Sequence, residues 1–218
     1  MSIYKKIEAN EARIEAGESL PIARQIDLYS KGLIAKLKNA EYALFKIIEF
    51  STQIDSSTLT SQFTFLDMVH FYLDSFFAFS YTSFDVIAQV INLKCNLNTP
   101  ETKVSFRKIK EKVNQANPGA AIQILINRIC NSNFFKDMEK YRNCSTHRRQ
   151  ICIQSNKTET LLTPGYIATI PMPIISHILC DDPLMLNPKF TKNREMITYC
   201  NGCFIKTQDE IIKILKKL

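Results

Sequence analysis

Two long stretches of helical periodicity constrain the fold of this 218-residue chain more than any other feature. In the first, apolar residues recur at steps of three and four, which places them on one stripe of a helix. Ser19 and Pro21 supply a start signal, because proline at the first helical position gives up only an amide hydrogen that the first turn does not use. The stripe that we predict to pack on another element comprises Ile26, Tyr29, Leu33, Leu37, Ala40, Leu44, Ile47 and Ile48, in a helix that reaches about Phe50.

The second stretch runs from about Phe63 to Leu93, after the polar run Ser51 to Gln62. As a helix it would be roughly 45 Å long at 1.5 Å per residue, far above the average for globular proteins. Its wide aromatic face predicts a position at the centre of a bundle, with the two long helices antiparallel. The apolar residues are Leu66, Val69, Leu73, Phe76, Phe77, Phe84, Ile87 and Ile91. The aromatic series also offers surfaces for stacking bases, but core or dimer packing is favoured because no basic residues are interleaved.

Shorter helices follow, each announced by a capping residue or a proline. We predict them over residues 100–116, 118–130, 133–147 and 191–218. Between the last two, the prolines of residues 150–190 forbid long helices and predict an irregular insertion, with a short β-hairpin from runs such as Tyr166 to Ile170. Residues 1–18 carry few large apolar side chains and are typical of an N-terminal arm. The chain is therefore expected to form one all-α domain, residues 1–218, with an irregular insertion.

The net charge and the cysteines of the chain indicate its partners and its cellular location. Lys and Arg outnumber Asp and Glu by 28 to 21, a net charge of +7 that favours polyanionic partners. The seven cysteines show no closely spaced even pattern, and the polar start of the chain shows no secretory leader, so we expect free thiols and a cytoplasmic location. The most apolar run, Phe71 to Phe84, contains Asp74 and is followed by Asp85. It is shorter than the roughly 20 residues that a bilayer crossing needs, so we expect no membrane contact.

The segment Tyr141 to Arg149 concentrates the most usable polar chemistry in the chain. If the helix continues through it, Asn143 and His147 are four residues apart and share a face, and the long side chain of Arg142 reaches the same spot. Histidine titrates near neutral pH and can move the proton of a 2′-hydroxyl or of a leaving oxygen, while arginine binds a phosphate with two hydrogen bonds. This trio therefore predicts phosphodiester cleavage without a metal or another cofactor.

The run Arg142-Asn143-Cys144-Ser145-Thr146-His147 resembles the signature of the HEPN superfamily, in which arginine is followed by four to six residues and then histidine near the end of a helix. Asn143 fits the preference of that family for Asn, Asp or His directly after the arginine. The order of elements is also similar, with two long antiparallel helices first and the motif helix later. The resemblance covers about residues 20–149 and the last helix, whereas residues 150–190 have no counterpart.

The resemblance implies a homodimeric, metal-independent endoribonuclease in which the 2′-hydroxyl of RNA attacks its own phosphate. In that role His147 is the general base or acid, Arg142 stabilises the charge on phosphorus and Asn143 positions the phosphate. It also implies service as a toxin or phage-defence effector, with an antitoxin or a nucleotidyltransferase as partner. Many members of the superfamily bind without cutting, so the alternative is a non-catalytic module for dimerisation, RNA binding or protein interaction.

Other interpretations of these residues stay open. Arg142 and His147 also suit the C-terminus of any helix, where cations favour the last carbonyls. Arg148 and Arg149 are candidates for contacts with RNA phosphates or are simply solvated, and Asp85 is a candidate ion-pair partner that orients Arg142. A zinc site is a competing interpretation, because two pairs have the spacing of zinc ligands, Cys144 with His147 and Cys200 with Cys203. We favour the interpretation that these cysteines are ordinary buried thiols of the core. A basic strip at Lys103, Arg107, Lys108, Lys110 and Lys112 faces RNA or only water.

Overall fold

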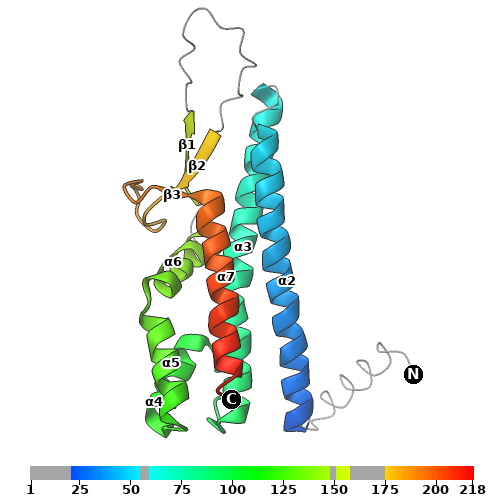
Figure 1. Ribbon diagram of the computed structural model, residues 1–218, viewed down its shortest axis with the longest axis vertical. Coiled ribbons are helices and arrows are strands. Elements are labelled where there is room, and N and C mark those ends of the chain that lie inside the picture. The colour runs from blue at the N-terminus through cyan, green and yellow to red at the C-terminus, as the bar shows by residue number, and fades with distance from the viewer. Residues whose placement is uncertain (1–20, 55–58, 148–150, 158–174) are drawn as a thin grey trace, which may run out of the picture.

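A computed structural model describes residues 21–54, 59–147, 151–157 and 175–218 of the chain. It is a helical bundle built on two long antiparallel helices, α2 (Ile22–Ile54) and α3 (Leu59–Lys94), which lie side by side along its length (Figure 1). Pro21 begins α2, since its carbonyl accepts from the backbone N–H groups of Arg24 and Gln25. The predicted pair of long helices is confirmed, and each extends a few residues beyond its predicted bounds.

Helix α3 forms the centre of the bundle and contacts α2, α4, α6 and α7. Its aromatic residues pack as predicted: Phe76, Phe77 and Phe84 are fully buried. Residues 65–94 are long and apolar enough to cross a membrane by length and composition alone, but 61% of their most apolar window is buried inside the fold. Burial of this kind is what the core helix of a bundle shows. Ile48 departs from the predicted stripe of α2, since it is 39% exposed.

The predicted start at Thr99-Pro100-Glu101 is wrong for the helix that follows α3. Residues Glu101–Lys103 form a single 3₁₀ turn, η1, and α4 (Phe106–Ala116) begins five residues later. Thr99 does not cap a helix because its backbone N–H and carbonyl are both bonded to the side-chain amide of Asn92 on α3, at 3.0 and 2.8 Å. Ser105 is the cap instead, accepting from the N–H of Lys108.

Helices α5 (Ala120–Asn131) and α6 (Asn133–His147) follow at about the predicted places. The hydroxyl of Ser132 accepts from the N–H of Phe135 and starts α6. Aromatic stacking joins α6 to α3: the rings of Phe77 and Tyr141 lie parallel with centroids 4.5 Å apart, and Phe135 contacts Phe84 edge to face. These contacts fix α6 antiparallel to α3, so the end of α6 faces the first half of α3.

The chain between α6 and α7 contributes three short antiparallel strands, two within the insertion and one after it. β1 (Ile153–Lys157) pairs with β2 (Ile175–Leu179), and β2 pairs with β3 (Arg194–Glu195). The hairpin that the sequence predicted is therefore present, but its strands lie at the margins of the proline-rich stretch, and Tyr166 to Ile170 lies outside the described residues, as do residues 1–18. Helix α7 (Met196–Leu215) begins after β3, later than the predicted residue 191, because Glu195 caps it by accepting from the N–H groups of Ile197 and Thr198.

Candidate RNA-processing site at the end of helix α6

Two buried residues set the orientation of the motif helix near its end. Tyr141 is fully buried and donates to the carbonyl of Cys180 at 2.5 Å, while the Cys144 thiol lies 3.2 Å from the carbonyl of Pro183. These positions are three residues apart and therefore share the face of α6 that packs on the core and on the segment after β2. The residues between and beside them, Arg142, Asn143 and Ser145, are consequently half-buried at the edge of the bundle.

The side chains of Arg142 and Asn143 contact each other. A guanidinium nitrogen of Arg142 donates to the Asn143 side-chain oxygen at 2.9 Å. The guanidinium carbon lies 5.3 Å from the centre of the Tyr81 ring on α3, within the range of a cation–π contact. The Arg142 carbonyl also accepts from the Ser145 hydroxyl at 3.0 Å. An arginine held by a ring and a hydrogen bond loses part of its freedom of movement, which favours recognition of a phosphate by two hydrogen bonds.

Asp85 lies within electrostatic reach of Arg142 and has a further role that the sequence did not reveal. One of its oxygens accepts from the backbone N–H of Phe106 at 2.9 Å, so Asp85 caps the start of α4. Burial raises the pKa of the Asp85 carboxyl, while the Phe106 N–H and the positive charge of Arg142 oppose that rise. The proposed orienting role of Asp85 toward Arg142 stays a prediction.

Glu139 is the residue near the motif that sequence reasoning missed. It accepts from the Tyr81 hydroxyl at 3.1 Å and from two nitrogens of Arg107 on α4. Burial alone would raise the pKa of Glu139, but hydrogen bonds and charge from Arg107 outweigh it and the pKa is lowered. Glu139 lies three residues before Arg142 on the same helix, a spacing that is a usable signal for a side-chain neighbour. Its carboxylate fixes Tyr81, the ring on which Arg142 lies.

Asp74 is a second carboxyl on this face of α3. Tyr81 follows Asp74 by seven residues, and Asp85 follows Tyr81 by four. This spacing places all three residues on one stripe of the helix. One oxygen of Asp74 is buried and forms no hydrogen bond, and burial raises the pKa of the carboxyl to about 6. One turn earlier, burial lowers the pKa of His70, and the nearby buried His177 of β2 lowers it further. This stripe of α3 thus carries a buried carboxyl whose pKa is raised well above its ordinary value.

The remaining motif residues lie at the limit of the described chain. His147 is the last residue of α6, and its side chain lies outside the described part. Arg148 and Arg149 are also outside the described residues, so their predicted contacts with RNA stay predictions. The helix does continue from Asn143 to His147, and the four-residue spacing therefore places both positions on one face of α6.

The zinc interpretation gains nothing from the described residues. Cys200 and Cys203 are buried on α7, and burial raises the pKa of the Cys203 thiol to about 12 and that of Cys200 well above its usual value. A thiol with a raised pKa is a poorer metal ligand, since metals bind the thiolate. Within the described part of the chain, no group of three His, Cys, Asp or Glu side chains has the geometry to hold a metal ion.

A protein-family model described as Cthe2314-like HEPN matches residues 29–164, more than half of the chain. The chain belongs to this HEPN family. The matched region takes in nearly all of α2, the helices α3 to α6 and β1, so the motif from Arg142 to His147 lies within it. No curated protein and no solved structure matches the chain significantly. The HEPN superfamily includes ribonucleases and non-catalytic members, and its helical fold with a short hairpin is the one seen here.

Proposed function

We propose that this HEPN protein is a metal-independent endoribonuclease whose site is formed by Arg142, Asn143 and His147. The observation that carries the proposal is the placement of the Arg142 guanidinium, bonded to Asn143 and lying on the Tyr81 ring near the end of α6. His147 ends the same helix one turn beyond Asn143. A guanidinium, an amide and an imidazole on one helix end supply the groups that phosphodiester cleavage needs.

The reaction would proceed by attack of the RNA 2′-hydroxyl oxygen on the adjacent phosphorus. The new bond closes a 2′,3′-cyclic phosphate, and the bond from phosphorus to the 5′-oxygen of the next nucleotide breaks. A base accepts the 2′-hydroxyl proton and an acid supplies a proton to the leaving 5′-oxygen, and His147 can serve in either role because histidine titrates near pH 6.5. Arg142 stabilises the charge that develops on the phosphate oxygens, and Asn143 fixes their position.

The experiment compares cleavage of single-stranded RNA by the wild type, His147→Ala and Arg142→Ala, all with chelator present. Each substitution is expected to lower the rate by at least about 100-fold, because positioned acid–base groups and charge stabilisation contribute about 10² to 10⁴ each. Arg24→Ala, which removes an arginine from the far end of the bundle, is the matched control and should cleave like the wild type. Equal cleavage by all four proteins would reject the assigned site.

The assembly and setting that go with this function are a homodimer in the cytoplasm that acts on RNA, with an antitoxin or a nucleotidyltransferase as its controlling partner. A dimer can place two copies of the motif at one interface. Size-exclusion chromatography with light scattering tests the first point, and a monomer at all concentrations would contradict it.

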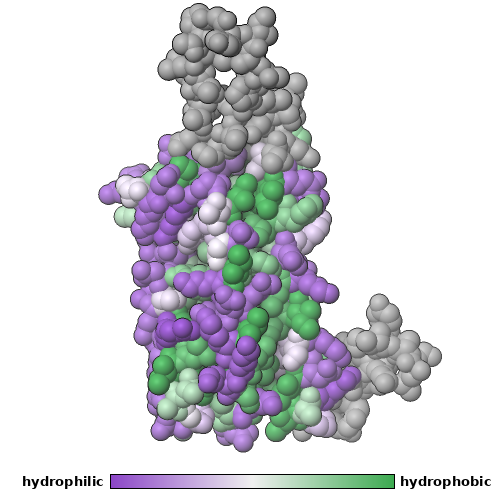
Figure 2. Space-filling model, viewed as in Figure 1, coloured by the Kyte–Doolittle hydropathy of each residue, from purple (hydrophilic) through white to green (hydrophobic). Residues whose placement is uncertain are grey.

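The second candidate function is a non-catalytic interaction module, and exposed apolar side chains favour it. On the face drawn in Figure 2, hydrophobic side chains reach the surface in a band that runs lengthwise between hydrophilic ones. The most exposed large residues of α2 and α3 include Ile34, Tyr42, Phe45 and Phe71, each more than half exposed. Clusters of this kind mark surfaces that another protein covers. Loss of self-association in Phe45→Asp with RNA cleavage absent from the wild type would favour this module over the nuclease.

A further inference from the structure

A cleft beside the motif helix has no role in the site described above. It has a volume of about 450 Å³ and lies between the first half of α6 and the segment that leads through β3 into α7. Its wall contains Lys136, Lys140, Lys192 and Arg194, together with Asn133 and the single carboxylate of Asp137. When the Asp181 and Asp182 carboxylates near Lys140 and Lys192 are counted with Asp137, the four cations exceed the carboxylates by one, so an anion is favoured here.

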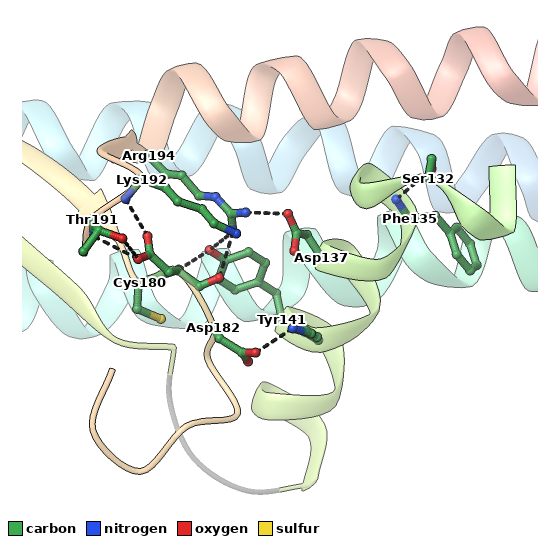
Figure 3. Close-up of polar contacts among 11 residues, drawn as sticks. Ser132, Phe135, Asp137, Tyr141, Cys180, Asp182, Thr191, Lys192 and Arg194 are labelled. Atoms are coloured by element: carbon green, nitrogen blue, oxygen red, sulfur yellow. Dashed lines mark hydrogen bonds and ion pairs between the residues drawn. The ribbon is translucent and has the colours of Figure 1, made fainter. Parts of the chain in front are cut away.

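Two of the four cations are used to build the wall. Arg194 donates to Asp137 at 2.5 Å, to the Tyr141 hydroxyl at 2.9 Å and to the carbonyl of Asp181, and its side chain is only 10% exposed (Figure 3). Lys140 forms an ion pair with Asp182 at 2.5 Å. These bonds tie the loop before α7 to α6, so the cleft is formed before any ligand arrives.

The other two cations, Lys136 and Lys192, remain for a ligand. Among the described residues, neither ammonium group has a carboxylate oxygen within 4 Å, and both side chains are exposed. The Lys192 ammonium lies within electrostatic reach of the Asp181 and Asp182 carboxyls without forming an ion pair with either. Lys136 and Lys192 line the cleft from two different elements, Lys136 from α6 and Lys192 from the loop before α7.

The cleft lysines of α6 and two of the motif residues, Asn143 and His147, share one face of the helix, while Arg142 lies on the neighbouring face. Positions 136, 140, 143 and 147 are separated by steps of four, three and four residues, which keeps them on a single stripe of the helix. From Lys136 to His147 the stripe is about 16 Å long, at 1.5 Å per residue. A strand that follows this stripe therefore passes from the lysines to Asn143 and His147 without leaving the surface of α6.

We propose that this cleft binds the phosphates of single-stranded RNA next to the nucleotides that are cleaved, with Lys136 and Lys192 as its ligand contacts. The proposal rests on the proposed function, because it takes RNA as the substrate of the motif. In this proposal the cleft increases the affinity for RNA and fixes the path of the strand, while Arg142 and His147 carry out the cleavage.

Binding and cleavage are measured separately to test it. Binding of a short fluorescein-labelled single-stranded RNA is followed by anisotropy in a His147→Ala background, which prevents cleavage during the titration. The test variant is Lys136→Glu/Lys192→Glu, and Lys136→Gln/Lys192→Gln is a milder second variant. Lys216→Glu/Lys217→Glu, at two exposed positions after the end of α7, carries the same change in net charge and is the matched control. Circular dichroism establishes that each variant is folded.

We expect at least tenfold weaker binding for the glutamate variant, about threefold weaker binding for the glutamine variant and less than a threefold change for the control. The slope of log affinity against log salt should become less steep by about 1.4 in the glutamate variant, since each phosphate contact on a single strand contributes about 0.7. In the background that retains His147, cleavage at saturating RNA should stay within threefold of the wild type.

The other outcomes separate the two proposals. Equal weakening by the test and control variants would overturn the cleft while leaving the nuclease intact, provided that His147→Ala abolishes cleavage. Selective weakening by the cleft variants, with cleavage unaffected by His147→Ala, would support the cleft and overturn the catalytic site. No binding of RNA by the wild type would overturn both.

Discussion

The two flanks of α6 each hold an arginine beside an aromatic ring, but they use it differently. On the flank toward α7, Arg194 is nearly buried and donates to the carboxylate of Asp137, the Tyr141 hydroxyl and the carbonyl of Asp181. On the flank toward α3, Arg142 is half-buried, bonds to the neutral amide of Asn143 and lies over Tyr81. A guanidinium whose charge is already matched holds the fold together. A half-buried guanidinium at the edge of the bundle, within electrostatic reach of Asp85 and Glu139, can still be reached by an anion.

The largest expected effect comes from removing the structural arginine. Arg194→Ala leaves the Asp137 carboxylate without its cation in a site where both side chains are more than 80% buried, and loss of one partner of such a pair costs about 3–5 kcal/mol. We expect this fall in the free energy of unfolding by urea denaturation. Arg24→Ala, at an ion pair whose side chains are 35% and 42% exposed, should cost less than about 1 kcal/mol. A similar loss of unfolding free energy in both variants would contradict the structural role given to Arg194.

Arg142→Ala is the converse case. We expect a loss of about 1 kcal/mol in unfolding free energy, because Arg142 is half-buried and its hydrogen bond to the neutral Asn143 amide and its cation–π contact each contribute modestly. RNA cleavage should fall by about 100-fold. Urea denaturation and a cleavage assay on the same preparation measure the two effects. A large loss of stability here would make Arg142 a structural residue like Arg194.

Asp85 connects the functional flank to α4, and two substitutions separate its roles. Asp85→Ala removes the acceptor of the Phe106 N–H and should lower the free energy of unfolding by about 1–3 kcal/mol. Asp85→Asn keeps a neutral acceptor and should cost less than about 0.5 kcal/mol, because asparagine and aspartate cap equally well. If the Asp85 charge orients Arg142, the asparagine variant still loses cleavage while it stays folded. Full cleavage by Asp85→Asn would limit Asp85 to capping.

The smallest expected effect is a pH dependence at Asp74. Burial raises its pKa to about 6 from an ordinary value of 3.8, so the folded state holds this proton more tightly than the unfolded state does. The resulting stabilisation is complete below about pH 3.8 and is lost as the pH rises through about 6. Asp74→Asn should therefore raise the melting temperature at pH 8 relative to the wild type, with no gain at pH 4. Asp209→Asn, at an exposed position of α7, is the control and should behave alike at both pH values.

The sequence predicted the helical elements well, because each depends on residues that are near one another in the chain. The apolar stripe of α3 lies in the core as expected, and the start of α6 after Ser132 follows from a local capping bond. The pairing of Arg142 with Asn143 is also local. The helix start near Thr99 was misplaced because Asn92, on another element, bonds to the backbone that the cap signal would have used.

What the sequence by itself determined is thus the set of helices, the HEPN-like motif and the positions of the motif residues around their helix. Each of these depends on residues within one segment, and the period of 3.6 residues fixes the side of the helix on which each position lies. Only the tertiary structure decided the partners from distant segments: Tyr81 under Arg142, Asp85 at the start of α4, and Arg194 against Asp137, 57 residues away. The basic cleft likewise exists only once α6 meets the loop before α7. Contacts of this kind depend on how whole helices pack, and no spacing along the chain encodes that packing directly.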